Sequence, residues 1–157
     1  MIFLVEDDAH RSLLRFFGMP RKNILAMGSK GNVIKKLKDH PGATGIVDED
    51  PGYDPPHEFA NYRLTERSEG VQLQLRTRQG GGQRLIVVCP EVEDWLLQRA
   101  RVSEVDPRQY HLRSTAKELR ELPDYEKKES FQQFLSALTD RSDKGMSLLR
   151  QWVFQGA

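Results

Sequence analysis

Several features that would point to a particular class of protein are scarce in this chain of 157 residues. It has one cysteine, Cys89, which excludes an internal disulfide framework and a cysteine-rich zinc site. No apolar run approaches the roughly 20 residues that a membrane helix needs, so we expect no membrane association. Lysine and arginine together number 24 and aspartate and glutamate 23, so any basic surface for nucleic acid must be local.

The residues that are present are typical of a globular protein. Hydrophobic residues make up 38% of the chain and charged residues 30%. We expect one domain spanning residues 1–157, which at this length buries roughly 70% of the surface of the unfolded chain. Acids follow directly after the first short apolar run, which argues against a signal peptide and favours a cytoplasmic protein. Cys89 follows an apolar run and is expected to be a buried, unreactive thiol.

Two short apolar runs end at carboxylates. Residues 2–5 lead into Glu6, and residues 45–47 lead into Asp48 and Asp50. If these runs are parallel strands, the acids lie at the carboxyl edge of a sheet, where open α/β folds bind their ligands. Converging carboxylates repel one another unless a cation lies between them, and such oxygen ligands suit Mg²⁺ or Mn²⁺. The sequence therefore predicts a divalent-metal site.

Apolar periodicity predicts an α/β fold. Over the first 48 residues the expected order is β-α-β-α-β, with strands at 2–5, 24–27 and 45–48 and helices at 9–18 and around 33–37. This order predicts a parallel sheet with right-handed crossovers.

The pattern changes after residue 50. Further strands are expected at 62–65, 71–76 and 84–89, with a glycine turn at 80–82. Pro90 is placed in the first turn of the next helix. Two helices around 131–138 and 146–153 follow, and residues 112–128 have no clear pattern. The expected architecture is a central, mostly parallel sheet flanked by helices, with a β-hairpin and C-terminal helices.

Four segments together resemble the Toprim domain, the metal-binding module of topoisomerases, primases and OLD-family nucleases. They are Val5-Glu6-Asp7-Asp8-Ala9-His10, Gly28-Ser29-Lys30-Gly31-Asn32-Val33, Asp48-Glu49-Asp50 and Pro90-Glu91-Val92-Glu93-Asp94-Trp95-Leu96-Leu97. The chain is most similar to the small stand-alone Toprim-like proteins of bacteria. The likeness covers a core of residues 1–100, and the helical part at 101–157 is only loosely comparable.

The resemblance implies a Rossmann-like fold and metal-assisted hydrolysis of a phosphodiester in DNA or RNA. Asp48 and Asp50 would hold Mg²⁺ or Mn²⁺, Glu91 or Glu93 would supply a further carboxylate, and Glu6 would be the general acid/base or another ligand. A role in phage defence is a further implication. The chain has no tyrosine-bearing cleavage domain and no primase partner, so a topoisomerase or primase is not expected.

The loop around Lys30 is a candidate phosphate site. Gly28 and Gly31 flank this lysine just before a helix, where backbone N–H groups and a cation suit a phosphate. The first motif departs from the Toprim pattern, since Asp7 replaces a glycine and His10 replaces an acid. Asp7, Asp8 and His10 are therefore additional candidates, and His10 would be a softer ligand or a hydrogen-bond partner.

Two alternatives stay open. The first is a response-regulator receiver domain, because residues 4–8 look like its opening and Asp48 falls near the position of the phosphoacceptor. However, no Lys-Pro pair occurs in the chain, and alternating strand 71–76 does not suit repeated βα units. The second is a non-catalytic Toprim-like module that regulates a separately encoded ATPase partner, which the changes at Asp7 and His10 favour.

Some candidates also have simple structural explanations. Acids at strand ends are often helix caps or solvated loop residues. The basic strand residues could form a nucleic-acid surface, although an ordinary solvated sheet face explains them as well; they are Arg63, Arg67, Arg76, Arg78 and Arg84.

Overall fold

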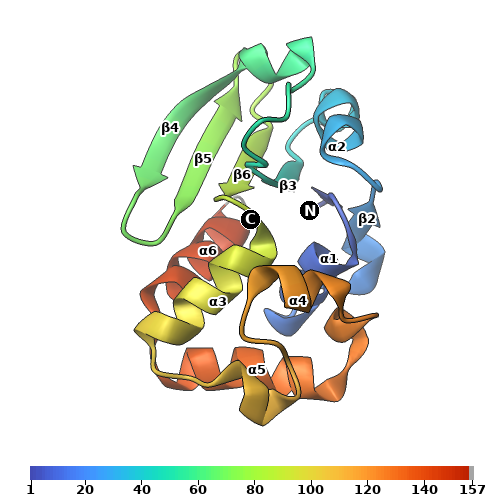
Figure 1. Ribbon diagram of the computed structural model, residues 1–157. Coiled ribbons are helices and arrows are strands. Elements are labelled where there is room, and N and C mark those ends of the chain that lie inside the picture. Colours follow the sequence, from blue (N-terminus) through green and yellow to red (C-terminus); the bar gives the residue numbers. More distant parts are fainter. Residues whose placement is uncertain (156–157) are drawn as a thin grey trace.

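The computed structural model describes residues 1–155 and shows an α/β fold built on one six-stranded sheet (Figure 1). The strands are β1 (Phe3–Val5), β2 (Ile24–Ala26), β3 (Thr44–Asp48), β4 (Tyr62–Ser68), β5 (Leu73–Arg78) and β6 (Arg84–Val88). The helices are α1 (Asp8–Phe16), α2 (Lys30–Leu37), α3 (Val92–Val102), α4 (Ala116–Glu121), α5 (Glu129–Asp140) and α6 (Lys144–Gln155). Short 3-10 helices are η1 (Arg21–Asn23), η2 (His57–Asn61), η3 (Pro107–Tyr110) and η4 (Tyr125–Lys127).

The sheet has the strand order β2-β1-β3-β6-β5-β4. The strands β2, β1 and β3 are parallel, as the β-α-β-α-β pattern predicts, and β6 pairs parallel to β3 as well. Strands β5 and β4 continue the sheet in antiparallel fashion. Because β1, β3 and β6 are parallel neighbours, their carboxyl ends meet at one edge of the sheet.

Helices cover both faces of the sheet and divide the core into two clusters. On one face, Leu4 and Val47 contact the apolar side of α2. On the other face, Phe3 and Ile46 belong to a larger cluster with α1, α3, α5 and α6 (Figure 1). The alternation of side chains along each strand produces this division. No helix within residues 1–155 is both long and apolar enough to cross a membrane.

Helix α2 lies close to the sheet because β3 has a glycine at the contact. A Cβ atom on Gly45 would lie 3.0 Å from side-chain carbons of Val33, Leu37 and Leu85. These neighbours are themselves fully buried, so a larger residue would push α2 away from β3.

A buried ion pair joins the C-terminal helices. Arg99 of α3 lies 3.5 Å from Asp143, and their side chains are only 2% and 0% exposed. Asp143 also accepts hydrogen bonds from the Ser103 hydroxyl and the Met146 backbone N–H, both at 2.9 Å. It thus caps the N-terminus of α6 as well as neutralising Arg99.

The structure corrects several local expectations. Strand β5 begins at Leu73 and not at residue 71, because Gln72 has a left-handed φ of 56° and belongs to the preceding turn. Helix α3 begins at Val92, so Pro90 precedes the helix and does not lie in its first turn. Cys89 is half-buried at the sheet edge, whereas a fully buried thiol was expected.

Other expectations are confirmed or completed. The helices expected around 131–138 and 146–153 are α5 and α6. The region 112–128, which had no clear pattern, contains α4 and η4.

We predict that Asp143→Ala lowers the free energy of unfolding by about 3–5 kcal/mol, because it leaves the buried Arg99 without its counter-charge. Urea denaturation of the variant and of the wild-type protein measures this difference. Asp140→Ala, at an exposed position on the preceding helix, is the matched control and should change stability by less than about 0.5 kcal/mol. Equal losses in both variants would contradict the structural role of the pair.

Candidate functional site

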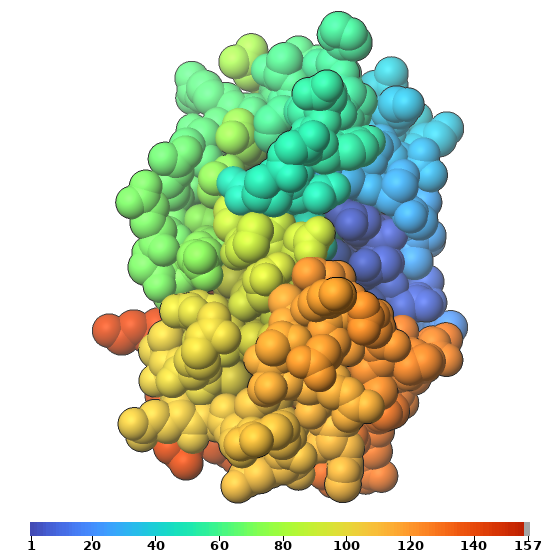
Figure 2. All heavy atoms as spheres, in the orientation of Figure 1, coloured from blue at the N-terminus to red at the C-terminus, as the bar shows by residue number. Residues whose placement is uncertain are grey.

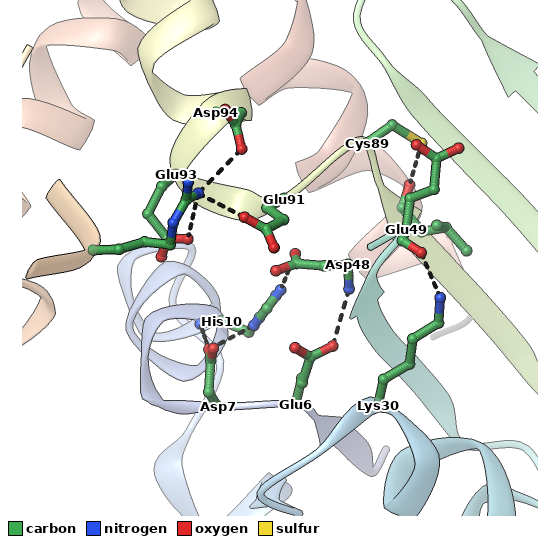
Figure 3. Close-up of polar contacts among 12 residues, drawn as sticks. Glu6, Asp7, His10, Lys30, Asp48, Glu49, Cys89, Glu91, Glu93 and Asp94 are labelled. Atoms are coloured by element: carbon green, nitrogen blue, oxygen red, sulfur yellow. Dashed lines mark hydrogen bonds and ion pairs between the residues drawn. The ribbon is translucent and has the colours of Figure 1, made fainter. Parts of the chain in front are cut away.

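Three strands bring acidic residues to the carboxyl edge of the sheet, as predicted. Glu6 follows β1, Asp48 ends β3, and Glu91 precedes α3 just after β6. The close-up shows the carboxylates of Glu6, Asp48 and Glu91 turned toward the same region (Figure 3). The parallel register of β1, β3 and β6 is the reason why residues more than 80 positions apart approach one another.

A buried histidine, His10, lies between the carboxylates of Asp48 and Asp7. His10 Nε2 lies 2.9 Å from Asp48 Oδ1, and His10 Nδ1 lies 2.6 Å from Asp7 Oδ1. The His10 side chain is 0% exposed and that of Asp48 8%. Both ring nitrogens face carboxylate oxygens, which accept hydrogen bonds, so the arrangement suits an imidazolium that donates two of them.

The pKa of each partner reflects this arrangement. Burial by itself lowers the pKa of His10, but the hydrogen bonds and charges of Asp48 and Asp7 raise it well above 6.5. Burial opposes ionisation of Asp7, yet His10 holds the pKa of Asp7 below its ordinary value. Asp7 also accepts the backbone N–H of His10 and so caps α1. The two departures from the Toprim pattern therefore form one hydrogen-bonded unit with Asp48.

Glu6 is held partly out of water beside Asp48. Its Oε1 accepts the backbone N–H of Asp48 at 3.2 Å. Burial, followed by the charge of Asp48, raises the pKa of Glu6 from 4.5 to about 7. A carboxyl group with this pKa can both accept and donate a proton near neutral pH.

The acids after β6 have partners from the C-terminal part of the chain. Arg120 of α4 lies 2.6 Å from Glu91 and 3.2 Å from Asp94. Glu93 accepts a hydrogen bond from the Tyr125 hydroxyl and is 8% exposed. Of the two predicted carboxylates, Glu91 faces Asp48 (Figure 3). Glu93 is instead bound to the Tyr125 hydroxyl.

Arg120 and Tyr125 were not identified from the sequence as partners of these acids. They lie in the segment without apolar periodicity, and nothing in its pattern distinguishes them from the other charged and polar residues there.

Lys30 lies at the start of α2, the helix on the other face of the sheet from α1 and His10. Its Nζ donates to the Glu49 carbonyl oxygen at 2.6 Å, and the residue is only 8% exposed. Burial lowers the pKa of Lys30, although nearby carboxylates, Glu6 first among them, oppose this. The structure thus places the predicted phosphate-binding lysine close to the carboxylates but against the backbone of the β3–η2 loop.

The remaining candidates in these loops have local roles. Gly28 has a left-handed φ of 86°, and Gly31 is buried beside the Tyr53 hydroxyl. Asp50 has a left-handed φ of 51°, and its N–H donates to the Pro90 carbonyl at 2.9 Å. Asp8 pairs with Arg11 at 3.4 Å on the surface of α1.

The acids are suitable metal ligands in type, but they do not form a ready-made cluster. Within residues 1–155, no three histidine, cysteine or acidic side chains are grouped closely enough to hold a metal ion. One oxygen each of Asp48 and Glu6, Oδ2 and Oε2, makes no hydrogen bond within the same residues. Hard oxygen atoms beside a carboxyl of raised pKa fit Mg²⁺ or Mn²⁺, because a cation relieves their repulsion.

Comparison with known proteins adds no assignment. No protein-family model, curated protein or solved structure matches this chain. The functional argument therefore depends on the geometry of the site.

Cys89 takes no part in the carboxylate edge. Burial, followed by the charge of Glu49, raises the pKa of its thiol to about 12. The thiol is therefore protonated at neutral pH, which supports the expectation of an unreactive cysteine even though the side chain is only half-buried.

We predict that His10 is a doubly protonated imidazolium near neutral pH and that Asp7→Asn lowers its pKa. The substitution removes one of the two charges that raise the pKa, while an amide oxygen can still cap α1. Nitrogen-15 shifts of the imidazole ring, followed by NMR over a pH series, measure both effects. Asp8→Asn is the control and should leave His10 unchanged. A neutral His10 ring at about pH 7 in the wild-type protein would contradict the assignment.

We also predict that Glu6→Gln changes how stability depends on pH. The pKa of Glu6 is about 7 in the folded protein and 4.5 in an unfolded chain. Between pH 4.5 and pH 7 the folded protein therefore keeps a proton on Glu6 that the unfolded chain has lost. Wild-type stability therefore falls as the pH rises through this window, by about 1–2 kcal/mol after allowance for solvent screening. Glutamine does not titrate, so the variant lacks this loss.

Urea denaturation at several pH values tests this second prediction. Glu69→Gln, in an exposed turn, is the control and should keep the wild-type slope. The same slope in Glu6→Gln as in the wild type would show that Glu6 is not the group responsible.

Proposed function

We propose that this protein is a Toprim-like, Mg²⁺- or Mn²⁺-dependent hydrolase of phosphodiester bonds in nucleic acid. The observation that supports it best is the position of Glu6, a half-buried carboxyl group of raised pKa that faces Asp48 at the carboxyl edge of a parallel sheet. Burial and, after it, the charge of Asp48 disfavour the ionised form of Glu6, and a divalent cation beside the two carboxylates would favour it. A role in phage defence is part of the proposal and rests on the resemblance alone.

In this proposal some of the carboxylates would bind the metal ion and one would transfer protons. Asp48, Asp50 and Glu91 would hold the cation, which when bound would neutralise phosphate charge and make the attacking water more acidic. Glu6 would take a proton from that water as its oxygen forms a bond to phosphorus. The bond from phosphorus to the leaving sugar oxygen would break on the side opposite the attacking water, and that oxygen would take its proton from solvent.

One feature favours a second candidate, a non-catalytic module that regulates a separately encoded ATPase partner. His10 already neutralises Asp48, and Arg120 already neutralises Glu91, so part of the acidic edge is compensated by the chain itself. A site of this kind can be stable without a metal. Metal-independent folding with no cleavage of nucleic acid would support this candidate.

The fold is less favourable to a receiver domain. A receiver needs repeated βα units, whereas β5 and β4 are antiparallel additions to the sheet. Asp48, the position of the phosphoacceptor in that interpretation, is 6% exposed and bound to His10.

The proposal predicts that the wild-type protein binds Mn²⁺ and Mg²⁺ and cleaves DNA or RNA, and that Asp48→Asn/Asp50→Asn does neither. Glu6→Gln should still bind metal but should cleave about 100-fold more slowly or worse, because it cannot transfer a proton. Calorimetric titration measures binding, and plasmid, single-stranded DNA and RNA substrates measure cleavage.

The matched control is Asp39→Asn/Asp140→Asn, which removes two exposed acids elsewhere and should behave as the wild type does. Folding of each variant is checked by its urea midpoint, because Asp48 also holds His10. Metal binding without cleavage would favour the regulatory module, and the absence of both in the wild-type protein would overturn the proposal.

A further inference from the structure

A cleft of about 460 Å³ lies beside the carboxyl edge, next to α2. Its walls come from the N-terminus of α2, the loop between β3 and η2, and the strands β4 and β5. The side chains that matter are those of Lys30, Tyr53, Phe59, Arg67, Gln74 and Arg76. In Figure 2 the loop (teal) lies between the hairpin (green) and α2 (blue).

Arg76 is held in a fixed position on the floor of the cleft. Its guanidinium lies over the Phe59 ring, with 4.7 Å between the Cζ atom and the ring centroid. Nη1 donates to the Tyr62 carbonyl oxygen at 3.2 Å, and Nη2 to the Gln74 side chain at 3.4 Å. Its buried Nε has no hydrogen-bond partner in residues 1–155. This nitrogen is shielded from solvent, so Arg76 supplies the cleft with a fixed positive charge and not with a free donor.

Tyr53 supplies an aromatic surface. It is 45% exposed, and its backbone N–H donates to the Asp50 carbonyl oxygen at 3.0 Å, which fixes the turn that carries it. Lys30 Nζ lies 5.7 Å from the centre of the Tyr53 ring. Aromatic side chains of this kind, next to cations, are the usual platforms for the bases of single-stranded nucleic acid.

The cleft continues toward the β4–β5 turn. A second hollow of about 350 Å³ shares Glu49, Arg67 and Gln74 with the first and extends to Cys89. Arg67 lines both hollows; half of its side chain is exposed, and it lies 3.6 Å from Glu69. Two acids, Glu49 and Asp50, line the cleft together with the cations Lys30, Arg67 and Arg76.

We propose that this cleft binds one unpaired nucleotide of a single-stranded nucleic acid, with its base against Tyr53 and its phosphate at Arg67 and Arg76. The volume of the cleft falls in the range of small-molecule sites and suits one nucleotide. Duplex DNA offers no free base face to Tyr53, so the site selects unpaired strands. The inference deepens the proposed function by naming its substrate class, but binding in this cleft needs neither metal nor hydrolysis.

Fluorescence anisotropy of labelled oligonucleotides in the presence of EDTA tests the cleft separately from catalysis. The probes are a single-stranded DNA, an RNA of the same sequence and the corresponding DNA duplex. We expect the single strands to bind about 10-fold or more tightly than the duplex. Tyr53→Ala should weaken single-strand binding about 10-fold, whereas Tyr53→Phe, which keeps the ring, should bind as the wild type does.

Arg67→Gln tests the phosphate contact. It should weaken binding and lower the slope of log affinity against log salt by about 0.7, the value for one phosphate of a single strand. Arg63→Gln is the matched control, because Arg63 is exposed on the same strand and does not line the cleft. Both arginine variants leave the core unchanged, so loss of folding does not confuse the comparison.

The outcomes separate the two proposals. Single-strand binding that depends on Tyr53 and Arg67 supports the cleft, even if no cleavage occurs and the hydrolase proposal fails. Wild-type affinity in both Tyr53→Ala and Arg67→Gln overturns the cleft, as does equal affinity for duplex and single strand. Metal-dependent cleavage could still be found in that case, and it would then act on a strand bound elsewhere.

Discussion

The carboxyl edge of this sheet depends on how negative charge is held out of water. Asp48, at the end of the central strand β3, is almost completely buried. An ionised carboxylate in such a place destabilises the folded protein unless a cation or strong hydrogen-bond donors compensate its charge. His10 compensates it from α1, and the same imidazole also contacts Asp7 at the start of that helix. His10 thus links α1 to the end of β3 and neutralises part of the charge at the edge, while the apolar side chains of α1 pack it on the sheet. Glu6, which no cationic side chain contacts directly within residues 1–155, keeps a raised pKa.

The C-terminal helices take part in the same charge balance. Arg120 and Tyr125 reach Glu91, Glu93 and Asp94 from the region between α3 and α5. The helical part thus does more than cover one face of the sheet, since it also neutralises the first turn of α3. Arg99 and Asp143 show the same kind of compensation in the core, where each buried charge is paired with the other and Asp143 is also hydrogen-bonded.

The carboxyl edge of the sheet and the neighbouring cleft carry different kinds of side chain, which suit different parts of a substrate. Acids converge at the ends of β1 and β3, whereas cations and aromatic rings line the cleft between α2 and the hairpin. Lys30 lies at the boundary, close to the carboxylates yet bonded to the Glu49 carbonyl and flanked by Tyr53 and Phe59. In a hydrolase, such a boundary would bring a phosphate next to the acids while the base remains among the aromatic rings.

The sequence by itself determined the α/β class, the parallel order of the first strands and the meeting of Glu6 with Asp48. These follow from local patterns, because an apolar run that ends in an acid and alternates with helices can satisfy its backbone and its burial in few ways. Only the tertiary structure decided the partners of those acids. His10, Arg120 and Tyr125 reach the edge from three different elements, and no local pattern records which donor will neutralise which carboxylate. The start of β5 was misplaced for a related reason, since the left-handed turn at Gln72 is stabilised by its surroundings and not by its residue type.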